Sequence, residues 1–170
     1  GQKGYHGVAI VSKLPFETTD IRTFCDKIDS RHISVAFGER AQLAKPLVLH
    51  NFYVPAGGDI PDPVLNPKFD HKLKFLDEMK ACEPLHPRGD DRHILVGDLN
   101  IAPLEQDVWS HKDRLDVVSH TPIEVERMGK LGDGLGWPLH LLRQHDVDEA
   151  GRDRGAEQAR PFEGAVDLAE

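Results

Sequence analysis

The sequence has 170 residues and a formal net charge of −8, since 29 Asp and Glu outnumber 21 Lys and Arg. This length is typical of one domain, and the acidic balance argues against a protein that coats nucleic acid by bulk charge. It leaves room for an enzyme that binds DNA through one local basic face. With two cysteines, no long apolar run and no signal-peptide pattern, we expect a soluble, cytoplasmic monomer without a disulfide framework or membrane span.

Four short apolar segments predict β-strands. They cover residues 7–12, 31–37, 47–54 and 94–96, and the first and third are rich in β-branched or aromatic residues. Between the last two segments, Asn66 and Pro67 form a good helix start, and apolar residues at helical spacing predict a helix over residues 67–81. A further short helix is expected over residues 106–115. Alternating strands and helices indicate the α/β class.

The sharpest motif is Gly-Asp-Leu-Asn-Ile-Ala-Pro over residues 97–103. If the chain stays extended after the fourth strand, Asp98 and Asn100 project on the same side. A carboxylate there can hold a divalent cation or accept a proton from water, and an amide can orient that water or donate to a phosphoryl oxygen. Gly97 permits a close approach to the backbone. The alternative is an Asx turn in which both side chains cap local backbone groups.

A second motif ends the third strand, at His-Asn-Phe-Tyr-Val-Pro over residues 50–55. Strand alternation places Asn51 and Tyr53 on one face and His50 and Phe52 on the other. A tyrosine at the carboxyl end of a strand in an α/β sheet can reach a bound phosphate. The alternative is a core tyrosine whose hydroxyl lies at the rim.

These blocks occur in the order found in the exonuclease III family. GQKGYHGVAI comes first, NFYVP follows at 51–55, GDLNIAP at 97–103, and DVWSHK and VVSHTP close the series at 107–112 and 117–122. Over residues 1–127 the chain resembles bacterial members of that family, the apurinic/apyrimidinic endonucleases of the endonuclease/exonuclease/phosphatase fold. The resemblance implies two face-to-face mixed β-sheets flanked by helices, and metal-dependent hydrolysis of phosphodiesters in DNA repair.

Carried over residue by residue, the resemblance implies that Tyr53, Asp98 and Asn100 are catalytic. Asp98 would act on the attacking water or the leaving oxygen, and together with Asn100 it would lie at the Mg²⁺ or Mn²⁺ ion. We expect Lys3 and Asn51 to contact the substrate, double-stranded DNA with abasic sites or 3′ ends. For Lys3 an exposed lysine without a role is an equal alternative.

The resemblance is partial. The family's principal glutamate ligand and its closing Asp-His block find no counterpart between Gly1 and Glu170. We therefore expect residues 1–128 to supply only the middle of the fold, residues 129–170 to form a divergent, poorly ordered tail, and this chain to have little or no activity. The alternatives are a different phosphoesterase of the same superfamily and a non-catalytic remnant or binding module.

Overall fold

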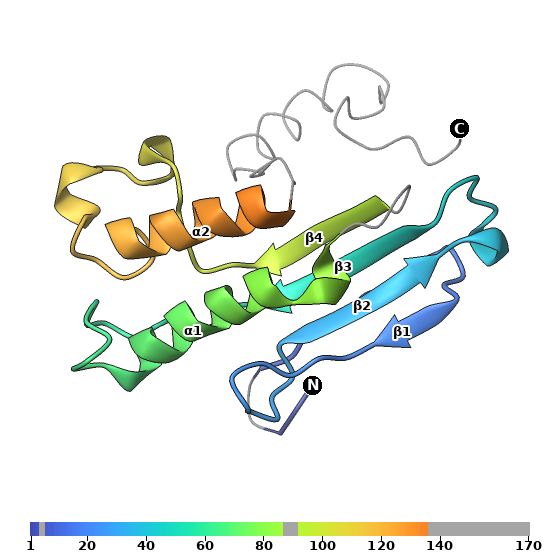
Figure 1. The fold of residues 1–170 in the computed structure, drawn as a ribbon, viewed down its shortest axis with the longest axis horizontal. Helices are drawn as coiled ribbons and strands as arrows, with labels where there is room; N and C mark the ends of the chain where they lie inside the picture. Colours follow the sequence, from blue (N-terminus) through green and yellow to red (C-terminus); the bar gives the residue numbers. More distant parts are fainter. Residues whose placement is uncertain (4–5, 87–91, 136–170) are drawn as a thin grey trace, which may run out of the picture. The chain divides into compact units, whose positions relative to one another are not determined.

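The computed structural model describes residues 1–3, 6–86 and 92–135 (Figure 1). The strands in this part of the chain are β1 (Thr18–Asp20), β2 (His32–Phe37), β3 (Leu47–Tyr53) and β4 (Arg92–Asp98). The α-helices are α1 (Pro67–Ala81) and α2 (Pro122–Leu135). Four single 3-10 turns join them: η1 (Glu39–Ala41), η2 (Glu83–Leu85), η3 (Glu105–Asp107) and η4 (Lys112–Arg114).

The described strands form one mixed sheet in the order β1-β2-β3-β4. The first two pairs are antiparallel, whereas β3 and β4 are parallel. A parallel pair needs a crossover connection, and α1 provides it. As a result the carboxyl ends of β3 and β4 lie side by side at one edge of the sheet, and the loops that follow them start from the same place.

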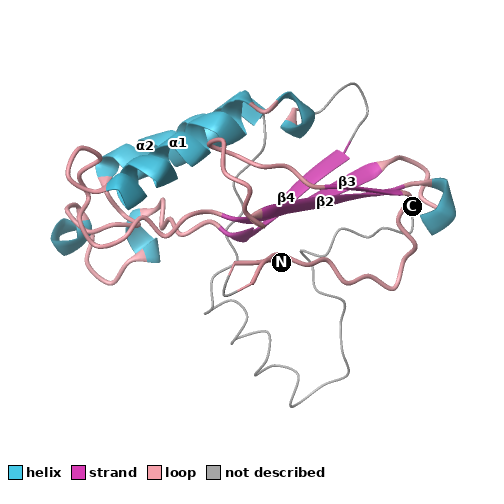
Figure 2. Ribbon diagram, turned by 90° about the horizontal axis from the view of Figure 1, so that it is seen from below, coloured by secondary structure: helices cyan, strands magenta, loops and turns pink. Residues whose placement is uncertain are grey.

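Both α-helices cover the same face of the sheet (Figure 2). Phe52 of β3 is fully buried and packs in one cluster with apolar side chains of both helices. The helix residues of this cluster are Phe75, Leu76, Met79, Met128, Leu131 and Leu135. On the other face, Val35 of β2 and Leu47 of β3 belong to a separate small cluster. The predicted alternation along β3 is therefore confirmed.

Helix α1 begins and ends at the predicted residues. The side chain of Asn66 accepts a hydrogen bond from Lys68 N, and Pro67 occupies the first turn, where its missing N–H costs nothing. Asn66 Nδ2 also donates to Gly57 O and Ile60 O, at 2.8 and 2.6 Å. One side chain thus caps the helix and holds the loop that follows β3.

A row of three histidines crosses the helix-bearing face of the sheet. His32 Nε2 lies 3.2 Å from His50 Nδ1, and His50 Nε2 lies 3.2 Å from His93 Nδ1. Burial lowers the pKa of His32 to about 4. Burial and then the two neighbouring imidazoles lower the pKa of His50 to about 3. The rings of His32 and His50 are consequently neutral near pH 7.

Two sequence predictions of local structure are wrong. Residues 7–12 pair with none of the described strands, and Val11 is 97% exposed. An apolar β-branched run becomes a strand only where a neighbouring backbone satisfies its N–H and C=O groups, and here Asn51 Nδ2 donates to Ala9 O instead. In place of one helix over 106–115 there are η3 and η4, because Val108 between them has extended backbone angles.

The α/β class is confirmed, with one mixed sheet and α1 and α2 in the described residues. The second of the two predicted sheets does not occur in that part of the chain. By contacts the chain divides into two units, residues 1–137 and 138–170. The tail predicted over residues 129–170 overlaps α2 as far as Leu135; its other residues, 136–170, lie outside the described residues, and their poor order stays a prediction. None of the helices over the described ranges is long and apolar enough to cross a membrane.

Candidate functional site

Two predicted site residues, Tyr53 and Asp98, come together at the carboxyl edge of β3 and β4. They are direct register partners in the parallel pair, so their backbones lie about 4.8 Å apart. Both project from the sheet face opposite the helices, in register with Asn51 and Val96. Asp98 is exposed and Tyr53 is half-buried. The topology therefore brings together side chains that are 45 residues apart in the sequence.

Gly97 makes this close pairing sterically feasible. Its φ is +129°, and a Cβ built there would lie 1.9 Å from Phe52 O and 2.8 Å from Asn51 Oδ1. The close approach predicted for Gly97 is confirmed, and the approaching group is the backbone of β3. Any larger residue would force β4 away from β3 next to Asp98.

The chain does not stay extended between Asp98 and Asn100, so the condition for their projecting on the same side is not met. Strand β4 ends at Asp98, and Asn100 takes a left-handed conformation with φ +52°. Asp98 Oδ1 accepts a hydrogen bond from Asn100 N at 3.0 Å, which closes an Asx turn. Asn100 Nδ2 donates to Val54 O at 2.9 Å. The capping interactions of the alternative interpretation are thus present.

These interactions leave several polar groups at the site uncommitted. An ionised carboxylate has two oxygens, and the Asx turn uses Oδ1 of Asp98. The Asn100 amide has a second N–H and its Oδ1. Within the described residues, the Tyr53 hydroxyl makes no hydrogen bond. Capping by Asp98 and Asn100 is therefore compatible with a role in binding a phosphate.

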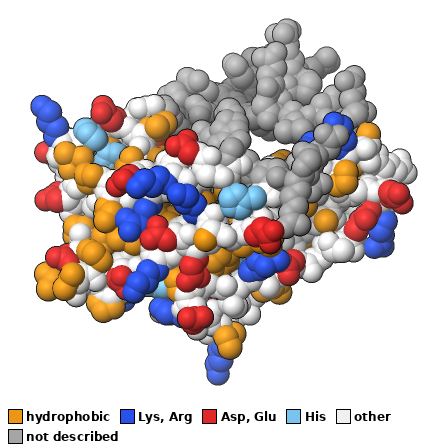
Figure 3. Space-filling model, viewed as in Figure 1, with side chains coloured by type: hydrophobic (Ala, Val, Ile, Leu, Met, Phe, Trp, Pro, Cys, Tyr) orange, Lys and Arg blue, Asp and Glu red, His pale blue; other side chains and the backbone are white. Residues whose placement is uncertain are grey.

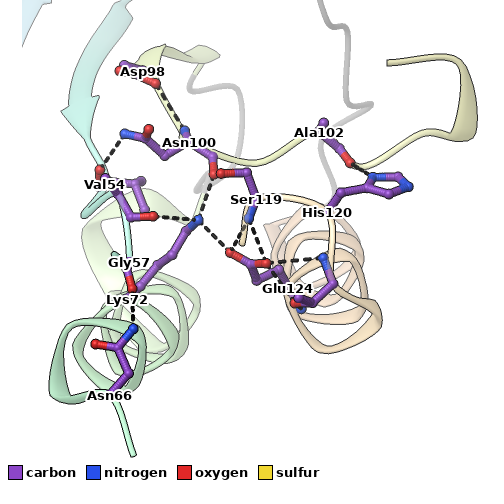
Figure 4. Close-up of polar contacts among 12 residues, drawn as sticks. Val54, Gly57, Asn66, Lys72, Asp98, Asn100, Ala102, Ser119, His120 and Glu124 are labelled. Carbon is purple, nitrogen blue, oxygen red and sulfur yellow. Dashed lines mark hydrogen bonds and ion pairs between the residues drawn. The ribbon is translucent and has the colours of Figure 1, made fainter. Parts of the chain in front are cut away.

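A buried lysine lies directly behind the Asx turn (Figure 4). Lys72 of α1 donates through Nζ to Asn100 O at 2.6 Å and to Ala56 O at 3.2 Å, and it forms an ion pair with Glu124 Oε1 at 2.5 Å. Both charged side chains are fully buried. Desolvation lowers the pKa of Lys72, and Glu124 and Asp98 partly counteract this effect.

The start of α2 forms the other wall behind the loop. Thr121 and Glu124 make a reciprocal capping box, in which Glu124 Oε2 accepts from Thr121 N and Thr121 Oγ1 accepts from Glu124 N. The loop itself is joined to this segment twice. Ala102 N donates to Ser119 O at 2.8 Å, and His120 Nδ1 lies 2.5 Å from Ala102 O.

Tyr53 is held by a buried arginine. Arg31 lies with its guanidinium carbon 5.0 Å from the centroid of the Tyr53 ring, and its Nη1 donates to Tyr53 O at 3.1 Å. Asp29 pairs with Arg31 Nε at 2.6 Å. The ring of His6 lies 5.8 Å from that of Tyr53. The Tyr53 side chain is thus packed against a cation whose position is itself fixed.

The two predicted substrate contacts are less closely tied to the site. Asn51 lies on the same sheet face as Tyr53 and Asp98, with Nδ2 donating to Ala9 O at 2.9 Å. Lys3 is exposed, and among the described residues no hydrogen bond or ion pair joins it to the other candidates. Substrate binding by Asn51 and Lys3 stays a prediction.

The acidic and amide oxygens of the site suit a hard divalent cation only in part. Asp98 and Asn100 offer a carboxylate and an amide carbonyl, and Mg²⁺ is often held by one or two carboxylates plus waters and substrate phosphates. Within the described ranges no group of three or more His, Cys, Asp or Glu side chains converges as a metal site. The residues present therefore fit an ion that is bound jointly with the substrate.

Three residues of this arrangement were missed by the sequence analysis. Lys72 occupies a buried position of α1, three residues after Phe69 and three before Phe75, and a charge on an apolar helix face is the signal that identifies it. The Thr-x-x-Glu pattern over residues 121–124 indicates the capping box that positions Glu124. For Arg31 the sequence offers no such signal.

Comparison with known proteins gives a family and a fold. The sequence pattern of the Endonuclease/Exonuclease/phosphatase family matches residues 1–156. Among solved structures, an AP endonuclease from Archaeoglobus fulgidus superposes with a TM-score of 0.58 at 19% identity. The 3′-5′ exonuclease NExo from Neisseria meningitidis gives 0.58 at 19%, and the 3′ phosphatase NExo from Neisseria, bound to a product DNA hairpin, gives 0.58 at 18%.

Each of these superpositions covers 72% of this chain and 44% of the other protein. The chain therefore spans less than half the length of the structures it matches. At this level of identity the likeness concerns the fold.

Proposed function

We propose a function for this chain, which belongs to the endonuclease/exonuclease/phosphatase family. In this proposal its site derives from a metal-dependent DNA phosphodiesterase. That enzyme cuts at abasic sites and removes nucleotides from 3′ ends. The observation that carries the proposal is the pairing of Tyr53 with Asp98 at the carboxyl ends of two parallel strands, with Asn100 in the adjoining turn. Two structural relatives, an AP endonuclease and a 3′-5′ exonuclease, support this choice within the superfamily.

In this proposal each side chain has a defined task. Asp98 accepts a proton from the attacking water through the oxygen that the Asx turn leaves free. The second N–H of the Asn100 amide and the Tyr53 hydroxyl donate to phosphoryl oxygens, where negative charge increases in the transition state. A Mg²⁺ or Mn²⁺ ion held by Asp98 and Asn100 would supply charge neutralisation at the phosphate.

The net charge limits where a DNA backbone can bind this chain. Lys and Arg are interspersed with Asp and Glu over the face that carries the helices (Figure 3). A chain of net charge −8 binds a polyanion only where cations are clustered. We propose that the duplex binds near Tyr53 and Asp98, because these candidate side chains project from the sheet face opposite the helices.

The test is cleavage of a 5′-labelled duplex that contains one synthetic abasic site, with protein in excess and Mg²⁺ present. We expect slow incision that is lost with Asp98→Asn and with EDTA. Asn at position 98 still accepts from Asn100 N, so the fold is retained. Asp133→Asn, an exposed carboxylate near the end of α2, is the matched control. Incision that persists undiminished in Asp98→Asn contradicts the assignment.

A further inference from the structure

The ammonium group of Lys72 joins three segments that are far apart in the sequence. Ala56 belongs to the loop after β3, Asn100 to the loop after β4, and Glu124 to the first turn of α2. A lysine ammonium has three hydrogens, and each has one acceptor here, at 3.2, 2.6 and 2.5 Å respectively. The group is therefore completely satisfied: two of its donors hold loops, and the third binds the first turn of α2.

The position of this ammonium is fixed from both sides. The Glu124 carboxylate also accepts from Ser119 N, Thr121 N and Thr121 Oγ1, so it has little freedom to move. The lysine stem passes Gly57 so closely that a Cβ there would lie 2.9 Å from Lys72 Cδ. A rigid donor in a buried environment interacts strongly with the carbonyls it contacts.

The carbonyl that Lys72 holds belongs to a residue whose other hydrogen bonds come from the ends of β3 and β4. Asn100 lies in a left-handed conformation between an exposed Asp98 and a half-buried Ile101. Its side chain and its N–H are restrained by Val54 O and Asp98 Oδ1, which are both at the ends of strands. Lys72 supplies the contact that anchors its carbonyl to the helical layer.

We propose that Lys72, oriented by Glu124, is a positioning residue that sets the Asn100 amide against the substrate phosphate. This inference rests on the proposed function, because it assigns Asn100 a phosphate contact. Lys72 does not itself touch substrate: it is fully buried and its three donors are engaged within the protein. A displacement of about 1 Å at a reacting group can lower a rate by roughly 100-fold, so the contact affects catalysis more than binding.

The experiment compares Glu124→Gln with the double variant Lys72→Met/Glu124→Gln. In the single variant the introduced amide oxygen can still accept from Lys72, so the lysine keeps its contacts to Ala56 O and Asn100 O but loses its counter-charge. The double variant loses these contacts and leaves no unpaired buried charge. Leu131→Ala, in the apolar cluster farther along α2, is the control for a general loss of stability. Two quantities are measured in the full chain: hydrogen exchange of the Asn100 backbone and side-chain amides by NMR, and kcat and KM for incision of the abasic-site duplex.

We expect Asn100 exchange to accelerate at least about 10-fold in the double variant relative to Glu124→Gln, with kcat lowered about 10- to 100-fold and KM changed by less than about 3-fold. Leu131→Ala leaves both the Asn100 exchange and kcat close to wild type. The proposal is overturned if Glu124→Gln and the double variant have the same Asn100 exchange, or if Leu131→Ala changes it equally. Because exchange needs no turnover, a wild-type chain without incision activity would refute the proposed function while the exchange data still decide whether Lys72 positions Asn100.

Discussion

Among the described glycines, Gly97 is the one whose replacement by alanine should lower the free energy of unfolding most. The new Cβ would lie 1.9 Å from Phe52 O, well inside the 3.0 Å that real Cβ contacts respect, and the obstacle is backbone rather than a flexible side chain. Strand β4 must therefore move away from β3. The backbone is also strained, since φ is +129°.

The magnitude follows from these two contributions. A non-glycine residue in such a conformation costs about 1–3 kcal/mol, and forcing a group into a packed site costs about 1–3 kcal/mol. The loss of freedom in the unfolded chain returns roughly 0.4–1 kcal/mol. We expect a net loss of about 3 kcal/mol, a large part of the 5–15 kcal/mol typical of a domain.

Urea unfolding followed by far-UV circular dichroism measures this change. The matched control is Gly129→Ala in α2, where nothing lies within 4 Å of the added Cβ, and which should stabilise the helix by about 0.5–1 kcal/mol. If Gly97→Ala unfolds within about 1 kcal/mol of wild type, the close approach of β3 and β4 next to Asp98 is not as described.

Two further predictions concern stability. Asn66→Ala should cost about 2 kcal/mol in urea unfolding, because it removes the cap of α1 and leaves Gly57 O and Ile60 O without their donor. The control is Lys130→Met, which removes an exposed ion pair and should cost less than about 0.5 kcal/mol. The free energy of unfolding should also fall as the pH drops from 6.5 towards 4. The folded pKa values of His32 and His50, about 4 and about 3, lie below their ordinary value of 6.5. Over this pH range the unfolded chain therefore binds protons that the folded chain does not. The slope is at most about 1.4 kcal/mol per pH unit for each ring, and His50→Leu should reduce it; an unchanged slope in that variant would show that other groups control acid unfolding.

Local sequence signals predicted α1, which has its cap, its proline and its apolar spacing within 15 residues. Helix α2 was not predicted, although its Thr121–Glu124 capping box is also a local signal. Strands β2 and β3 were found from their apolar runs, and the faces of Asn51 and Tyr53 from alternation alone. The prediction failed where the outcome depends on a distant partner: residues 7–12 have the composition of a strand, but no described strand pairs with them.

The candidate side chains Tyr53, Asp98 and Asn100 could be named from the sequence, because they stand in motifs that resemble one enzyme family. Three contacts could not: the pairing of Tyr53 with Asp98, the hydrogen bond from Asn100 to Val54 O, and the contact of Lys72 with Asn100 O. A motif consists of consecutive residues, whereas strand register and buried ion pairs join positions tens of residues apart. Such contacts form only when the whole sheet and its helices pack together.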